Sequence, residues 1–189
     1  MSDFITQKRE IISGDYVICS CEGTAEQVIM NILLDNDLLF FNRQNLIREE
    51  TTRIRTAGKI AQEFLGQAYA RKIHIMRVID SKRENFKLPR LYCNRPKDID
   101  EDVLNIYTHP EIEMLIILAE NKYQAYKATS SKLLPSQFCK KIFKKYNVKS
   151  NQFVQDYFAD TDVLIKAIKD YKRLSNLDKN ELCLADLLK

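Results

Sequence analysis

The chain has 189 residues, of which 45% are hydrophobic and 30% are charged, and its formal net charge is +4. These values are typical of a globular protein with one sizeable core, and four glycines and four prolines argue against long structureless loops. No apolar run is long enough for a membrane span, so we expect no membrane partner. The polar N-terminus is unlike a signal peptide, and the five scattered cysteines predict reduced thiols in a cytoplasmic protein.

The first predicted strand, residues 16–20, leads into Glu22-Gly23-Thr24-Ala25-Glu26 and then into a helix predicted over 25–35. This order places Glu22 at the carboxyl end of a buried strand, where open α/β sheets bind their ligands. Thr24 is expected to cap the helix, and Glu26 falls in its first turn. Two carboxylates with nothing basic between them suit Mg²⁺, although acids at a helix start also simply favour the helix dipole.

Three further elements follow in the next fifty residues. The apolar run at 38–41 predicts a short buried strand, and apolar residues at three- and four-residue spacing predict a long helix over 50–70. The run 72–80 predicts another strand, which ends in Asp80. Alternating strands and helices indicate a mainly parallel sheet, in which the ends of strands share one edge. Glu22 and Asp80 are therefore expected to converge, the alternative being that Asp80 belongs to a plain turn.

The segment after Asp80 carries cations. Lys82 and Arg83 are candidates for holding a phosphate beside a metal ion. An irregular stretch over 87–102 precedes residues 103–107, which predict a fourth strand, and a buried helix is expected after Pro110. An acid at the start of that helix is a third candidate ligand position.

The region after residue 128 shows no strand pattern and predicts three helices, at 133–146, 152–158 and 162–174, with an apolar tail at 182–188. Residues 132–149 contain six lysines and no acid. A basic face of this kind binds phosphate backbones, or is only a solvated helix face. The candidate nucleic-acid contacts are Arg83, Lys140, Lys141, Lys144 and Lys145. The aromatic residues of this region favour helix packing over base stacking.

Two short motifs resemble those of Toprim domains, in particular the OLD and RloB-like proteins. Glu22-Gly23-Thr24-Ala25-Glu26 after a strand resembles the opening motif, and Thr108-His109-Pro110-Glu111-Ile112-Glu113 resembles a later RloB-like signature. The resemblance covers roughly residues 15–126. It implies a four-stranded, mainly parallel sheet flanked by helices, which we expect to form a Toprim-like domain at 1–128. The loss of strand signals beyond it predicts a packed helical extension at 129–189. The resemblance also implies one or two Mg²⁺ or Mn²⁺ ions.

The resemblance assigns roles to individual residues. Glu22 and Glu26 match the first motif, Asp80 matches the first acid of an Asp-x-Asp motif, and Glu113 matches the later glutamate. The second acid of Asp-x-Asp is missing, because Lys82 stands in its place. Either Glu84 substitutes for that acid, or the metal chemistry is lost.

Two functions are consistent with these patterns. The first is a metal-dependent nuclease, a hydrolase of phosphodiester bonds acting in phage defence or in a mobile element. Its metal ligands would be Glu22, Glu26, Asp80, Glu84 and Glu113, and its catalytic residues Glu22, Asp80 and Lys82. The second, favoured by Lys82, is a degenerate Toprim-like protein that binds nucleic acid or serves as a subunit with a protein partner or a second copy of itself.

Overall fold

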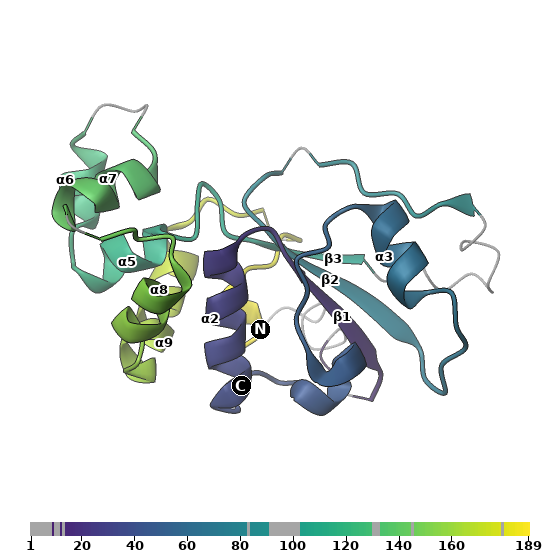
Figure 1. The fold of residues 1–189 in the computed structure, drawn as a ribbon. Coiled ribbons are helices and arrows are strands. Elements are labelled where there is room, and N and C mark those ends of the chain that lie inside the picture. Colours follow the sequence, from purple (N-terminus) through teal and green to yellow (C-terminus); the bar gives the residue numbers. More distant parts are fainter. Residues whose placement is uncertain are drawn as a thin grey trace.

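The computed structural model describes residues 9, 12, 14–82, 84–90, 103–129, 133–144, 146–178 and 180–189. The architecture is α/β, with a parallel sheet flanked by helices and a group of helices beyond one end of the sheet (Figure 1). Within these ranges no helix has both the length and the apolar character needed to cross a membrane.

The described sheet has three parallel strands in the order β1 (Tyr16–Cys21), β2 (Ile73–Ile79) and β3 (Val103–Tyr107). The helices are α2 (Thr24–Asp35), α3 (Ala57–Phe64), α5 (Met114–Ala119), α6 (Tyr123–Lys127), α7 (Pro135–Ile142), α8 (Asn151–Tyr157) and α9 (Thr161–Leu174). Three 3₁₀ turns complete the set: η1 (Arg43–Asn45), η2 (Ile47–Glu49) and η4 (Leu184–Asp186).

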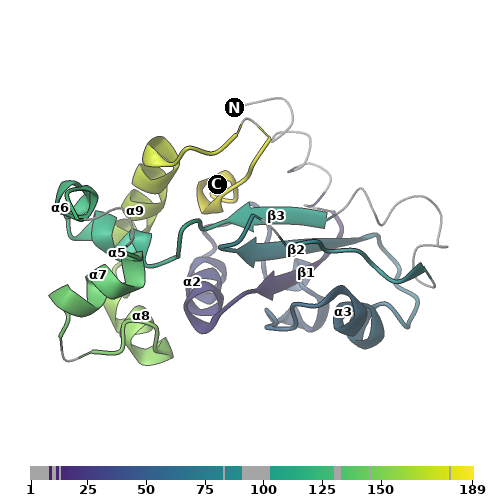
Figure 2. The same cartoon turned by 90° about the horizontal axis from the view of Figure 1, so that it is seen from above.

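The strands direct their carboxyl ends toward the group of helices. In Figure 2 the arrowheads of β1, β2 and β3 all point to the side where α5–α9 lie. Side chains that follow the strands therefore collect between the sheet edge and the helices, which is where parallel α/β sheets place their ligand sites.

Alternation along the strands builds one hydrophobic core on each face of the sheet. Ile18 and Ile75 are opposite each other and pack with α3. Val17, Cys19 and Met76 face the other way and join one large cluster with α2, α5, α7, α8 and α9. Residues predicted to form a Toprim-like domain and those predicted to form a helical extension thus share this second core.

The predicted strand at 38–41 is wrong, and no four-stranded sheet is formed by the described residues. Leu39 makes one antiparallel bridge to Leu188, while the backbone N–H of Phe40 donates to the carbonyl of Leu187. These contacts hold the C-terminal tail in place. The N–H of Lys189 donates in return to the Leu38 carbonyl, but the pairing amounts to one bridge, so the apolar run is buried without becoming a strand.

The position beside β1 is taken by residues 46–52 instead. Parallel bridges join Val17 to Leu46 and Ser20 to Thr52, and the N–H of Cys21 donates to the Thr52 carbonyl at 2.8 Å. The η2 turn interrupts this ladder, with Arg48 at a φ of 61°. This pairing also explains why the helix predicted over 50–70 is shorter, since α3 begins only at Ala57 once the extended segment has left β1.

The other predicted helices are confirmed within a few residues at their ends. The helix predicted at 25–35 is α2, and those predicted at 133–146, 152–158 and 162–174 correspond to α7, α8 and α9. The tail contains η4 and joins the far edge of the sheet, where the N–H of Tyr107 donates to the Leu182 carbonyl at 2.7 Å. The four described cysteines are free and buried, and Cys93 lies outside the described residues.

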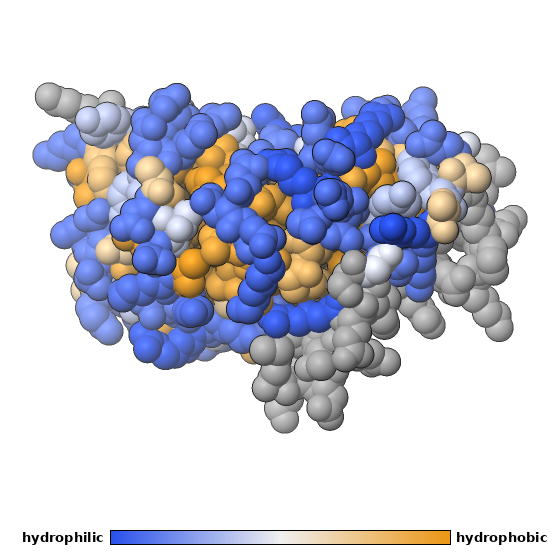
Figure 3. All heavy atoms as spheres, turned by 90° about the horizontal axis from the view of Figure 1, so that it is seen from below, coloured by the Kyte–Doolittle hydropathy of each residue, from blue (hydrophilic) through white to orange (hydrophobic). Residues whose placement is uncertain are grey.

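One face of the molecule combines a hydrophilic border with an apolar middle. Seen from below, apolar side chains gather in the middle of the face within a frame of hydrophilic ones (Figure 3). Among the described residues, the large hydrophobic side chains that are most exposed are Leu134, Tyr146 and Leu174, and all three belong to the helical group or its loops.

Candidate metal centre

Glu22 and Asp80 meet where β1 and β2 end. The register pairs Cys21 with Val78, and the N–H of Glu22 continues the ladder by donating to the Val78 carbonyl at 2.9 Å. Beyond this bond, the Glu22 carboxylate accepts a hydrogen bond from the backbone N–H of Asp80, with Oε2 2.9 Å from the nitrogen. The parallel register thus brings together two acids that are far apart in the sequence.

Glu26 lies in the first turn of α2 and is only 7% exposed. Gly23, not Thr24, is the N-cap residue, and no side chain caps this helix, so the predicted capping role of Thr24 is wrong. A Cβ at position 23 would be 2.7 Å from Oε2 of Glu26. The missing side chain of Gly23 therefore makes the room in which the Glu26 carboxylate lies.

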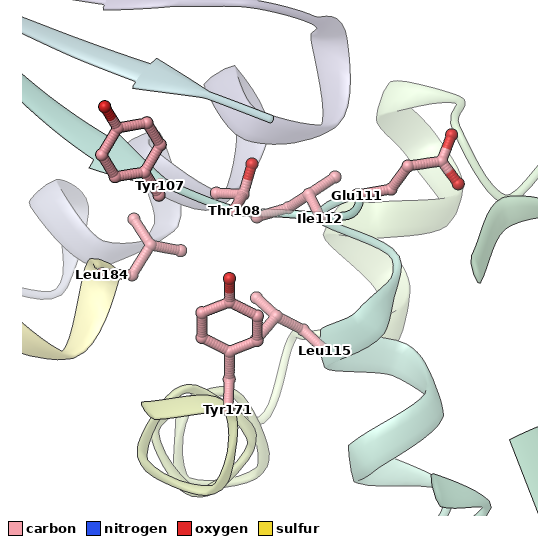
Figure 4. Close-up of a pocket in the computed structure, with 7 residues that line it drawn as sticks. All are labelled: Tyr107, Thr108, Glu111, Ile112, Leu115, Tyr171 and Leu184. Carbon is pink, nitrogen blue, oxygen red and sulfur yellow. The ribbon is translucent and has the colours of Figure 1, made fainter. Parts of the chain in front are cut away.

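Glu111 and Glu113 come from the connection between β3 and α5. The N–H of Thr108 extends the strand pairing by donating to the Ile79 carbonyl at 2.9 Å, and the Tyr171 hydroxyl donates to the His109 carbonyl at 2.7 Å. Figure 4 shows Tyr171 rising from α9 toward this connection, while the carboxylate of Glu111 points away from the small hollow around Tyr171. The hydroxyl of Tyr171 therefore fixes the connection to α9, and Glu111 points away from the hollow around Tyr171 (Figure 4).

These acids line one cleft of about 230 Å³ at the edge of the sheet. The lining side chains that can bind a cation or an anion are Glu22, Glu26, Asp80, Glu111, Glu113 and Lys149. Five carboxylates from three separate strand ends therefore face a single hollow. An all-oxygen donor set of this kind suits a hard divalent cation such as Mg²⁺ or Mn²⁺ better than it suits zinc.

Glu113 supplies a further sign that the cleft is built for a ligand. Its side chain is 2% exposed, and neither carboxylate oxygen has a hydrogen-bond partner among the described residues. The ion pair with Lys149 spans 3.7 Å between Nζ and Oε1, too long for a hydrogen bond. A buried carboxylate without a hydrogen bond destabilises a fold unless nearby charge compensates it; Lys149 offers such a charge at a distance, and a bound cation would offer another.

The crowding of carboxylates raises several pKa values. Burial raises the pKa of Glu26 to about 7; a hydrogen bond from its own N–H opposes this effect, and the charges of Glu113, Asp80 and Glu22 add to it. Burial, together with a hydrogen bond and the charge of Glu22, raises the pKa of Asp80 to about 6. The pKa of Glu113 is also raised, chiefly by burial. Several carboxylates of the cleft therefore keep their protons to a higher pH than free carboxylates do.

The arrangement of side chains stops short of a formed coordination site. No group of three or more His, Cys, Asp or Glu side chains that could hold a metal ion is found within the described ranges. Basic side chains form ion pairs with the acids instead. Arg55 contacts Glu22 at 2.5 Å and Glu84 at 2.6 Å, while Lys149 contacts Glu111 at 3.0 Å.

Glu84, the predicted replacement for the missing acid, is bound to two arginines. One oxygen pairs with Arg55 and the other with Arg77, a buried residue of β2. Burial alone would raise the pKa of Glu84, but the hydrogen bond from Arg55 and the charge of Arg77 hold it below its usual value. Glu84 does not line the cleft in this arrangement, and it reaches Glu22 only through Arg55.

The predicted cations lie at several separate places. Lys82 does not line the cleft but a neighbouring hollow, and it pairs with Glu181. Lys140, Lys141 and Lys144 are exposed on or just after α7, whereas Arg83 and Lys145 lie outside the described residues. Among the lysines of segment 132–149 that the structure describes, only Lys149 lines the cleft.

Three residues of the site were not predicted as site residues. Glu111 and Lys149 belong to stretches that the sequence singles out, the motif at 108–113 and the basic segment at 132–149, whereas the sequence gives no such signal for Arg55. Glu111 could have been found from the same connection that yields Glu113. Nothing in the sequence pairs Lys149 with these acids, because that contact depends on how the loop after α7 folds back.

Comparisons with protein-family models, with curated proteins and with solved structures gave no match to this chain.

Proposed function

We propose that the chain is a Toprim-like, divalent-cation-dependent nuclease whose active site is the carboxylate cleft. The observation that carries this proposal is the convergence of Glu22, Glu26, Asp80 and Glu113 on one hollow at the carboxyl edge of a parallel sheet. Residues 58 positions apart are hydrogen-bonded there, and the buried Glu113 carboxylate has no hydrogen-bond partner among the described residues. These features support a cation site better than a chance surface cluster.

The roles of the side chains follow from their positions. Glu22, Glu26, Asp80 and Glu113 would hold Mg²⁺ or Mn²⁺, which supplies Lewis-acid polarisation of a phosphate and acidifies a bound water. Among the described residues that line the cleft, Lys149 is the basic one, so it replaces Lys82 in our proposal as the donor to phosphate oxygens. Glu111 holds the Lys149 ammonium at 3.0 Å, which keeps it directed to this place.

A degenerate, binding-only protein is the second candidate. It is favoured by the pairing of Arg55 with Glu22 and of Lys149 with Glu111, which already neutralises part of the cleft. In such a protein these cations would take the place of the metal, and Lys140, Lys141 and Lys144 would provide the contact with nucleic acid. A role as a partner subunit or a homo-oligomer belongs to this second candidate.

One experiment separates the two candidates. Thermal unfolding is measured with EDTA, Mg²⁺ or Mn²⁺, and strand cleavage is measured under the same conditions on DNA and RNA. We expect the metal to raise the melting temperature of the wild type and to permit cleavage, and both effects to be lost in Asp80→Asn and Glu22→Gln. Glu50→Gln, an exposed position, is the matched control. A melting temperature that does not respond to either metal would exclude the nuclease.

A further inference from the structure

A second hollow of about 360 Å³ adjoins the carboxylate cleft, and we call it the side pocket. Its lining includes Lys82, His109, Met114, Tyr123, Leu174 and Asn176. This volume is within the range of small-molecule sites, roughly 300–1,000 Å³. The side pocket is larger than the carboxylate cleft, and unlike the cleft it combines apolar, aromatic and basic side chains.

The two hollows lie on opposite sides of one wall. The wall consists of the segments that follow β2 and β3, and these are joined by a contact of 3.2 Å between His109 Nδ1 and the Asp80 carbonyl. The Asp80 carboxylate lines the cleft, whereas Lys82, two residues later, lines the side pocket. His109, which lines the side pocket, thus touches Asp80, which lines the cleft, and a strand bound at the proposed metal site would pass beside the side pocket.

We infer that the side pocket binds the base of the nucleotide next to the scissile phosphate, and that the substrate is therefore single-stranded nucleic acid. This inference rests on the proposed function. The half-buried ring of Tyr123 and the Met114 side chain offer apolar contacts to a base, and Asn176 offers donors and acceptors for its edge. Lys82, whose ammonium pairs with Glu181, lies beside the wall, where the backbone phosphate would cross and compete for this charge.

Single-strandedness follows from what the pocket would have to hold, which is a whole base. A base inside a duplex is stacked and paired, and it must leave the stack before it can enter a pocket. An unpaired strand meets no such barrier. Residues of α5, α6, α9 and the segment after α9 all contribute to the lining, so an entire base, and not only a phosphate, has partners there.

The test separates this inference from the proposed function because it requires no metal and no cleavage. Binding of a nucleoside 5′-monophosphate, ribose 5-phosphate and inorganic phosphate is measured by NMR titration of the full chain in EDTA. We expect the nucleoside monophosphate to bind at least tenfold more tightly than ribose 5-phosphate. Equal affinity for the two would overturn the inference.

A variant that fills the pocket provides the second arm. Asn176→Trp places a bulky ring at an exposed position of the lining, while Gln62→Trp does the same on α3, on the other face of the sheet. We expect Asn176→Trp to weaken binding of the nucleoside monophosphate at least tenfold and Gln62→Trp to leave it unchanged. Unchanged binding by Asn176→Trp would refute the base pocket.

Cleavage assays then distinguish a failure of the proposed nuclease function from a failure of the base-pocket inference. A wild type that binds the nucleoside monophosphate but cuts no strand with Mg²⁺ or Mn²⁺ would refute the nuclease and leave the pocket standing as a nucleotide site. A wild type that cuts duplex and single-stranded substrates equally would refute the inference while leaving the nuclease intact. We expect single strands to be cut at least tenfold faster than duplexes.

Discussion

The Glu22 carboxylate accepts a hydrogen bond of 2.9 Å from the backbone N–H of Asp80, which ties together the loops after two neighbouring strands. This bond places Glu22 beside Asp80. The Arg55 guanidinium donates to the other carboxylate oxygen of Glu22, Oε1. The edge of the sheet is thereby fixed around a group of negative charges. Repulsion among these charges disfavours their ionised forms, and a bound cation would offset it.

The first prediction is that the metal-free protein loses stability as the pH rises from 5 to 8. The pKa of Glu26 in the folded protein is about 7, above its value in an unfolded chain. The folded state therefore binds this proton more tightly, and the stabilisation is complete below the unfolded pKa and lost as the pH passes 7. The loss from Glu26 is on the order of 3 kcal/mol.

Chemical denaturation in EDTA at several pH values checks this sign. The lowered pKa values of Glu84 and Glu111 act in the opposite direction, because their stabilisation is lost only as the pH falls below the ordinary glutamate range. Glu84 and Glu111 therefore do not alter how the stability changes between pH 5 and pH 8. Stability that rises across this window would mean that Glu26 is not buried among acids as described.

The second prediction concerns Glu26→Gln. The amide cannot ionise, so this variant should be more stable than the wild type in EDTA at pH 8, by on the order of 2 kcal/mol. At pH 5, where Glu26 is already protonated, the two proteins should be equally stable. Stabilisation by Mg²⁺ should be smaller in the variant, because one ligand has been removed. The change Glu50→Gln at an exposed position should produce neither effect.

How far the sequence predicted this site depends on the kind of contact involved. The order strand, acid, helix was sufficient to expect Glu22 and Asp80 at one edge, since parallel strands leave no other arrangement for their ends. The failure at 38–41 has a different cause, because backbone pairing to residues 46–52 and to Leu188 decides which segment adjoins the sheet. Lys149 and Arg55 could not be predicted, because both reach the acids from loops.

The third prediction concerns Gly23→Ala. The backbone of Gly23 has a φ of −132°, which alanine adopts without strain, so the variant should fold. Its new methyl group would be 2.7 Å from the Glu26 carboxylate, which must therefore move. We expect Mg²⁺ affinity, measured by calorimetry, to fall about tenfold. The change Gly58→Ala on α3, where a Cβ meets nothing within 4 Å, is the control. Unchanged Mg²⁺ affinity in Gly23→Ala would remove Glu26 from the ligand set.

The fourth prediction concerns the lysines of α7 and the loop after it. Lys140 and Lys144 are exposed, and Lys149, which follows in the same basic segment, lines the cleft. A phosphate backbone that leaves the cleft past Lys149 would be directed toward these charges. The double change Lys140→Gln and Lys144→Gln should therefore weaken binding of a single strand about equally for all sequences.

The dependence of this binding on salt distinguishes phosphate contacts from a solvated helix face. Each phosphate contact contributes about 0.7 to the slope of log affinity against log salt for a single strand, so the double variant should lower the slope by roughly 1 to 1.5. The changes Lys166→Gln and Lys169→Gln on α9 remove the same charge from exposed positions outside this segment. An equal loss of slope in both double variants would show that only net charge matters, because then no particular helix face would guide the strand to the acids.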